Sequence, residues 1–225
     1  MNTTVTPSAT AGTDGLDAWI APGRTALLII DVQVDFASPE GVLGRAGVDM
    51  SVVAPAVAGC ERMAAVARKC GVPVVFIGLQ TEAGLDSPTW RERYRRHGSP
   101  PNDDSAVCRA GQPGAAFVGP QPAPGELVID KIRYSGFFGT NLSAALKALG
   151  VDTLVVCGLT TECCVDCTVR DAFHLDYHVF VVSDASAAYE VEVHESSLKN
   201  MALICADIVT MDQVEASWEK ALVHG

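Results

Sequence analysis

Short, uninterrupted apolar runs recur along this 225-residue chain, and each is followed by a segment with helical spacing. Runs of this length without polar alternation are typical of strands that are covered on both faces, as in a parallel sheet. We expect six such strands, over residues 25–30, 73–78, 126–130, 153–157, 178–183 and 207–210. Strands that alternate with helices in this way predict an α/β fold, in which a mainly parallel six-stranded sheet lies between two layers of helices.

The segments between these runs predict the helices. The first would begin at Asp49 or Ser51 and end before Gly71, and the others would span residues 141–149, 162–177, 191–205 and 211–223. Residues 32–47 contain one proline and three glycines, which predict a loop. Residues 79–125 show little regular pattern apart from a possible helix over residues 89–97. A stretch this long inside a compact domain usually covers a functional site.

Composition favours one globular domain after a short arm. Residues 1–23 lack periodicity and predict a flexible arm, so that residues 24–225 would form a single domain. The net charge of −11 argues against nucleic-acid or anionic-membrane partners, because either would need a basic face. We see no apolar run near the roughly 20 residues of a membrane span and no features of a signal peptide, so a cytoplasmic location is expected.

Three reactive side chains lie at or just beyond the carboxyl ends of predicted strands: Asp31, Lys131 and Cys164. The carboxyl ends of parallel strands share one edge of the sheet, so we expect the three side chains to meet there. Cys164 would lie in the first turn of a helix, where unpaired N–H groups and the helix dipole favour a thiolate. A carboxylate can take the thiol proton and an ammonium can stabilise the thiolate. Alone, an aspartate after a strand often serves a turn, but together the three residues indicate nucleophilic chemistry.

The segments that carry these residues resemble the isochorismatase-like cysteine hydrolases, in the blocks LLIIDVQVDF, DKIRYSGFFGTNL and GLTTECCVDCTVRDA. The blocks occur in the family's order, and the resemblance covers nearly all of residues 24–212. It implies a six-stranded parallel sheet flanked by helices and a catalytic triad of Asp31, Lys131 and Cys164, the cysteine that directly precedes valine. It also implies a cis peptide at Leu159–Thr160 and an oxyanion hole formed by the backbone N–H groups of Thr160 and Cys164.

The resemblance also bears on the reaction. Family members that cleave the vinyl ether of isochorismate lack the cysteine, so this chain is expected to hydrolyse an amide. Members with a metal carry an Asp-x-His motif after the second strand, where this chain has GLQTEAG, so we expect no metal and no cofactor. The blocks look closest to the ureidoacrylate amidohydrolase branch, which favours a small ureido compound as substrate. An N-carbamoyl amine, a maleamate-like half-amide and biuret are the alternatives.

A substrate pocket is expected beside the triad. The resemblance implies substrate contacts for Tyr134 and for Gln80 or Glu82, and apolar wall candidates are Phe36, Trp90 and Phe137. The same residue types also fill ordinary cores. The arginines of residues 91–96 are either a solvated face or a contact for an anionic substrate. Relatives in this family commonly form dimers or tetramers, so a homo-oligomer is expected.

Other interpretations of the cysteine-rich segment stay open. Cys164 and Cys167 form a C-x-x-C motif at a helix start, which occurs in thiol redox proteins, although that chemistry would not need the other triad residues. A zinc site that includes Cys163 would need a fourth ligand, and adjacent cysteines fit a tetrahedron poorly. A binding module that kept the fold without activity is a third possibility, against which the intact triad argues.

Overall fold

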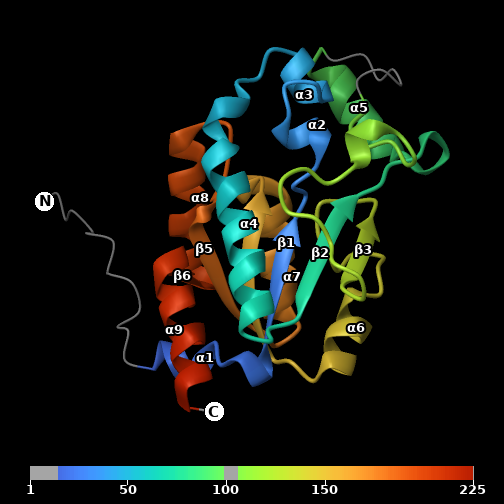
Figure 1. Ribbon diagram of the computed structural model, residues 1–225. Coiled ribbons are helices and arrows are strands. Elements are labelled where there is room, and N and C mark those ends of the chain that lie inside the picture. Colours follow the sequence, from blue (N-terminus) through green and yellow to red (C-terminus); the bar gives the residue numbers. More distant parts are fainter. Residues whose placement is uncertain (1–14, 99–105, 225) are drawn as a thin grey trace, which may run out of the picture.

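The computed structural model describes residues 15–98 and 106–224 and has three layers, with a sheet between two sets of helices (Figure 1). The strands are β1 Thr25–Ile30, β2 Val74–Leu79, β3 Leu127–Lys131, β4 Thr153–Leu159, β5 His178–Ala187 and β6 Asp207–Val209. They form one six-stranded sheet in the order β3-β2-β1-β4-β5-β6, and each neighbouring pair is parallel. The predicted α/β fold is confirmed, and each predicted strand exists, with β4 and β5 longer than expected.

The helices divide between the two faces of the sheet. One face packs against α4 Ala54–Lys69 and α9 Met211–His224, and the other packs against α6 Leu142–Leu149, α7 Asp166–His174 and α8 Val191–Ile204. In Figure 1, α4 lies in front of the sheet, to the left of β1, and α9 lies at the lower left, beside α1. The sheet is therefore buried on both faces, which explains why its central strands are buried at every position and are almost entirely apolar.

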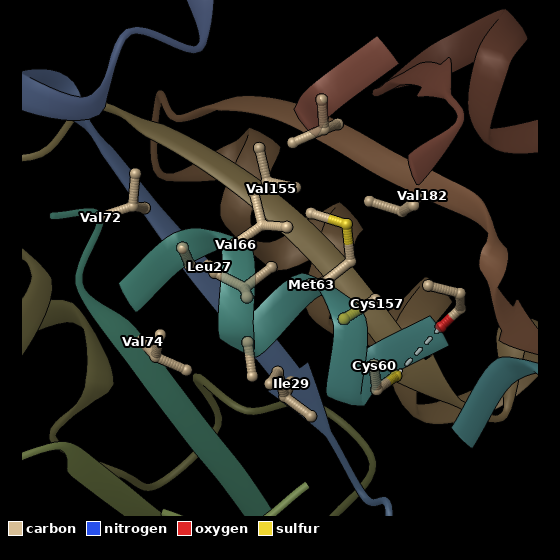
Figure 2. Close-up of a cluster of buried hydrophobic side chains, with 14 of the residues drawn as sticks. Leu27, Ile29, Cys60, Met63, Val66, Val72, Val74, Val155, Cys157 and Val182 are labelled. Atoms are coloured by element: carbon tan, nitrogen blue, oxygen red, sulfur yellow. Dashed lines mark hydrogen bonds between the residues drawn. The ribbon is translucent and has the colours of Figure 1, made fainter. Parts of the chain in front are cut away.

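Successive side chains of β1 alternate between the two hydrophobic cores, one on each face of the sheet. Leu27 and Ile29 belong to the core under α4, whereas Leu28 and Ile30 belong to the opposite core. Figure 2 shows the first core, where strand residues face α4. Its labelled members are Leu27, Ile29, Cys60, Met63, Val66, Val72, Val74, Val155, Cys157 and Val182. Both cysteines in this group are buried as small apolar residues, as the sequence predicts.

The amino-terminal region is a correction to the sequence prediction. Residues 15–23 are folded rather than flexible and include α1 Leu16–Trp19 and the start of the 3₁₀ helix η1 Pro22–Arg24. Ile20 is fully buried, and its carbonyl accepts a hydrogen bond from Trp218 Nε1 at 2.7 Å. Leu16 packs against the same core. These two apolar residues anchor the segment, which is too short to show a periodic pattern in the sequence. Residues 1–14 of the predicted arm lie outside the described residues.

Short helices cover the carboxyl ends of the strands, near the top of Figure 1. The predicted loop after β1 contains α2 Val34–Ala37 and α3 Val42–Arg45, and η2 Met50–Val52 then leads into α4. The predicted helix within residues 79–125 is confirmed as α5 Pro88–Arg96, flanked by the 3₁₀ turns η3 Ala83–Leu85 and η5 Pro113–Ala115. Four-residue helices leave too few periodic positions for a sequence pattern to reveal them.

One helical segment has the predicted length but is more apolar than the sequence interpretation allowed. Among the described residues, Met50–Lys69 has the length and composition of a membrane span, contrary to the expectation that no such run exists. Half of this segment is buried inside the fold, where α4 packs against the sheet. Its apolar composition is therefore accounted for by its place in the core.

Candidate active site

Asp31, Lys131 and Cys164 meet at the carboxyl edge of the sheet. Asp31 follows β1, Lys131 ends β3, and Cys164 lies in η6, the π-helical segment Thr161–Val165 after β4. The Nζ atom of Lys131 is 2.6 Å from Asp31 Oδ2 and 3.4 Å from Cys164 Sγ. The exposed fractions of Asp31, Lys131 and Cys164 are 1%, 0% and 6%, respectively, so the two charges and the thiol are held together away from bulk water.

The end of β4, shortly before η6, depends on a glycine. Gly158 has a φ of 126°, and a Cβ atom built on it would lie 2.1 Å from the carbonyl oxygen of Ile30. Only glycine permits this approach of β4 to β1 directly before Asp31. Asp31 itself has a φ of 51°, in the left-handed region that aspartate tolerates better than most residues. These two positions bring the start of η6 next to the end of β1.

The turn that carries Cys164 differs from the predicted α-helix start near residue 162. The helix begins with one π-helical segment, and the cis peptide implied by the family resemblance is present at Leu159–Thr160. The N–H groups of Cys163 and Val165 donate to the Thr160 carbonyl at 3.0 and 3.2 Å. The N–H of Thr160 donates to no acceptor among the described residues. Helix starts leave N–H groups free, so this turn can receive a negative charge.

Burial and neighbouring charges set the protonation states of the site. Burial raises the pKa of Asp31 and outweighs the opposing effect of the Lys131 charge. Burial alone would lower the pKa of Lys131, but the charges of Asp31 and Cys164 raise it overall, so Lys131 remains a cation. A hydrogen bond with Cys163, together with burial, raises the pKa of Cys164.

The shared hydrogen bond has the opposite effect on the neighbouring cysteine, since it lowers the pKa of the Cys163 thiol. The Cys164 sulfur, however, is the one that lies 3.4 Å from the Lys131 ammonium, and this cation favours a negative charge on it. Cys164 is a thiol at neutral pH until a base removes its proton. Asp31, which shares the ammonium with it and has one unpaired carboxylate oxygen among the described residues, is suited to this task.

Gln33 is a buried polar side chain that the sequence reasoning missed. Its Nε2 donates to the carbonyls of Leu79 and Ala115 at 2.9 and 2.7 Å, and its Oε1 accepts from the Leu79 N–H at 2.8 Å. Gln33 thereby connects the loop after β1 to the last residue of β2 and to Ala115 in η5. A polar residue between two valines, two positions after Asp31, was the available signal.

Thr168 and His194 both form hydrogen bonds with the segment that carries Cys164. Thr168 Oγ1 donates to the Cys164 carbonyl at 2.7 Å and accepts from the Gly136 N–H at 2.9 Å, so it links α7 to the loop after β3. The buried hydroxyl of Thr161 lies 2.8 Å from His194 Nδ1 on α8. The sequence offered no signal for this histidine, because its partner is 33 residues away in the chain.

A cavity of about 530 Å³ opens beside the nucleophile segment. Its wall comprises Leu79, Ser87, Thr89, Trp90, Arg93, Ile132, Arg133, Tyr134, Glu162 and Cys163. Trp90 and Tyr134 are two of the predicted substrate contacts, and the Trp90 Nε1 donates to the Tyr134 hydroxyl at 2.8 Å. The structure therefore brings α5, the loop after β3 and the start of η6 around one cavity.

The other predicted substrate contacts are not in this wall. Phe137 packs against the core formed by α6 and α7, and its ring centre is 6.1 Å from that of Tyr177. Phe36 packs in two small clusters near α2 and η5. Glu82 lines a separate cavity of about 910 Å³, and Gln80 continues the sheet by donating its N–H to the Lys131 carbonyl. Residue type alone did not separate wall residues from core residues.

The alternative sites proposed for the cysteines find little support. Within residues 15–98 and 106–224, no three His, Cys, Asp or Glu side chains are grouped as a metal site would need. The eight cysteines are free thiols. A redox-active C-x-x-C motif needs a first cysteine with a lowered pKa, whereas a hydrogen bond with Cys163, together with burial, raises the pKa of Cys164.

Comparison with known proteins shows the family to which the chain belongs. The isochorismatase domain matches residues 25–213. A ureidoacrylate amidohydrolase RutB from Methylobacterium radiotolerans is 37% identical, over 80% of this chain and 74% of its own length. A second RutB, from Variovorax paradoxus, is 30% identical over 98% of this chain and 97% of its own.

Solved structures show the same fold. A cysteine hydrolase from Pseudomonas syringae pv. phaseolicola has a TM-score of 0.80 and 29% identity, covering 90% of this chain and 96% of its own. The N-carbamoylsarcosine amidase from Thermoplasma acidophilum has a TM-score of 0.66 and 25% identity, covering 84% and 97%. On the match to the family domain and to these relatives, the chain belongs to the isochorismatase family.

Proposed function

We propose that this protein is a cysteine-dependent amidohydrolase that cleaves a ureidoacrylate-like compound through a thioester intermediate. The observation that carries the proposal is the placement of the Lys131 ammonium between the Asp31 carboxylate and the Cys164 thiol, in a buried site beside a cavity. A nucleophile, a base and a cation within contact distance are the components that acyl transfer requires. The names of the curated relatives support a ureido compound as the substrate.

In the first half of the reaction, Asp31 takes the proton of Cys164, and the Lys131 ammonium stabilises the thiolate that forms. The sulfur attacks the amide or ureido carbonyl carbon, and the carbonyl electron pair moves to oxygen. The N–H groups of Thr160 and Cys164 hold this oxyanion, as the family resemblance implies. The carboxylic acid of Asp31 then gives its proton to the departing nitrogen, the C–N bond breaks, and a thioester remains.

In the second half, Asp31 takes a proton from water, and the resulting hydroxide attacks the thioester carbonyl. The C–S bond breaks, and the proton returns from Asp31 to the cysteine sulfur. A ureido substrate gives ammonia or an amine together with a carbamate. Lys131 keeps Asp31 ionised at the start of each half-reaction, because a buried carboxylate without a partner would become protonated.

The substrate is best tested by an ammonia-release screen over ureidoacrylate, an N-carbamoyl amine, a maleamate-like half-amide and biuret. We expect ureidoacrylate to be turned over fastest. The similarity in fold to an N-carbamoylsarcosine amidase makes an N-carbamoyl amine the second candidate.

The mechanism is tested in the same assay with the variant Cys164→Ala, which should have no turnover, and with Cys167→Ala as a matched control that should keep it. Undiminished turnover by Cys164→Ala would contradict the assignment of the nucleophile. Reversible formation of a disulfide between Cys164 and Cys167, without amide hydrolysis, would instead support the redox interpretation. A thiol that iodoacetamide does not label near neutral pH would support a binding module.

We also propose a homo-oligomer of two or four subunits in the cytoplasm. Apolar side chains of α7 and α8 and of the residues that follow α7 are exposed, among them Phe173, Leu175, Leu203 and Ile204. Such exposed apolar residues are typical of an interface. Eight free cysteines are consistent with a reducing compartment. Light scattering on the purified protein tests the subunit number, and a monomeric mass would contradict it.

A further inference from the structure

We propose that Arg93 and Arg133 form a subsite for an anionic group, so that the substrate carries a carboxylate in addition to the bond that is cleaved. This inference rests on the proposed amidohydrolase function and deepens it by naming the chemical class of the substrate. The two guanidinium groups come from different elements, α5 and the loop after β3, and both belong to the wall of the 530 Å³ cavity that also contains Cys163.

The backbone of Arg133 is hydrogen-bonded to Lys131 of the proposed triad. Its carbonyl accepts a hydrogen bond from Lys131 Nζ at 3.1 Å, the same nitrogen that contacts Asp31 and Cys164. Its side chain is half-buried and donates one hydrogen bond, from Nη1 to the Ile132 carbonyl at 2.7 Å. The guanidinium has five N–H groups, so most of its donors remain available to a ligand in the cavity.

Arg93 has no competing partner among the described residues. On the same helix, Arg95 and Arg96 both form ion pairs with Glu92, at 2.8 and 3.8 Å. Arg93 has no side-chain hydrogen bond or ion pair within the described part of the chain, although it lies in the cavity wall. Arg93 is exposed, as the other arginines of α5 are, and it is distinguished from the paired Arg95 and Arg96 by its place in the cavity wall and its uncommitted guanidinium.

The charge of the cavity wall is opposite to that of the whole protein. The chain has a net charge of −11, yet the wall contains two guanidinium groups and one carboxylate, Glu162. Glu162 is itself engaged, because its Oε1 accepts from the Thr160 hydroxyl at 2.8 Å. A ligand carboxylate can receive paired N–H donors from a guanidinium, which are among the stronger hydrogen bonds in proteins.

The consequence is a rule for substrates. Ureido acids and half-amides have a free carboxylate and match the two arginines, whereas biuret and other neutral amides leave both guanidinium groups without a partner. The site should therefore discriminate by charge among compounds that carry the same scissile bond.

The test uses two alkylating reagents of nearly equal size, iodoacetate and iodoacetamide, which differ in charge. In both, the Cys164 sulfur displaces iodide and forms an S–C bond, so the rate of labelling at Cys164 reports access to the nucleophile without a known substrate. The measured quantity is the ratio of the iodoacetate rate to the iodoacetamide rate, followed by mass spectrometry of the Cys164 peptide. The variants are Arg93→Gln and, as a matched control, Arg91→Gln, which removes the same charge from α5 outside the cavity wall.

We expect Arg93→Gln to lower the ratio about tenfold, the effect of losing a charge-assisted contact, and Arg91→Gln to change it less than about twofold. A double variant that adds Arg133→Lys should lower the ratio further. Equal changes in the two single variants would overturn the subsite while leaving the proposed nucleophile intact. Absence of labelling at Cys164 by either reagent would overturn the proposed function, and the subsite with it.

The same variants are then compared on ureidoacrylate and its methyl ester. Arg93→Gln should raise KM for the acid about tenfold more than it raises KM for the ester. Turnover of the ester by the native protein with the same kcat/KM as the acid would also overturn the inference, because the arginines would then contribute nothing to selection.

Discussion

Replacing Lys131 with methionine should destabilise the protein strongly, and by an amount that depends on pH. Lys131 is fully buried and pairs with Asp31 at 2.6 Å. Methionine keeps much of the volume but leaves the Asp31 carboxylate buried without a cation. Removing one partner of a buried ion pair costs about 3–5 kcal/mol of unfolding free energy, because the remaining charge is uncompensated.

The direction of the pH dependence follows from the pKa of Asp31. Burial already raises this pKa in the native protein, and loss of the Lys131 charge raises it further. A carboxyl group with a raised pKa in the folded state imposes no cost below its unfolded pKa of about 3.9, where both states are protonated. As the pH rises toward the folded pKa, the folded state is penalised by about 1.4 kcal/mol per pH unit. The unfolding free energy of Lys131→Met should therefore be closest to that of the native protein near pH 4 and furthest below it near pH 7.

The assay is urea unfolding followed by circular dichroism at pH 4, 5, 6 and 7, for the native protein, Lys131→Met and the double variant Asp31→Asn/Lys131→Met. The double variant removes both charges, so its unfolding free energy should lie within about 1–2 kcal/mol of the native value and should lack the extra slope between pH 4 and 7. If the single and double variants are equally stable at pH 7, an uncompensated Asp31 charge is not the cause and the reasoning is wrong.

Three further predictions follow from the same site. Gly158→Ala should lower the unfolding free energy by about 3 kcal/mol or more, since its Cβ would lie 2.1 Å from a carbonyl oxygen of β1, while Gly150→Ala, with open space around it, should cost about 1 kcal/mol in urea unfolding. The pH profile of kcat/KM should fall on the acid side with an apparent pKa above the ordinary value of about 3.9, because the raised pKa of Asp31 protonates the base early; a midpoint below that value would contradict this. Thr168→Val should lower kcat about tenfold to a hundredfold by releasing the Cys164 carbonyl, which it holds at 2.7 Å, and unchanged kcat with normal stability would refute this positioning role.

The sequence predicts both the sheet and the meeting of the three site residues, because the apolar runs mark where each strand ends. The strand at residues 25–30 is apolar without a break and ends at Asp31, so the pattern gave both the strand and the place of its carboxyl end. Because neighbouring parallel strands end at the same edge, the positions of Lys131 and Cys164 after their own strands predicted that all three would meet. Their roles as base, cation and nucleophile stay predictions until the variants are made.

What the sequence could not supply is local geometry that depends on contacts between distant segments. Phe137 and Trp90 are both aromatic residues in irregular segments, yet one packs in the core and the other lines the cavity. Nothing in the pattern of α5 distinguishes Arg93 from Arg95, because the difference is whether Glu92 is within reach. The link from the Cys164 carbonyl through Thr168 to Gly136 is likewise a contact between distant segments that no local pattern reveals.

The contact between Asp31 and Lys131 joins residues that are 100 positions apart, across a sheet in which β2 lies between their strands. Loop closure over such separations is entropically costly, so pairings of this kind tend to form late in folding. Cys164 reaches the same point from the opposite side of β1 in the strand order. A chain with only one half of the sheet assembled would have at most part of the triad. We therefore expect enzymatic activity to return, on refolding, together with the last global step, so that activity serves as a strict measure of the fully assembled protein.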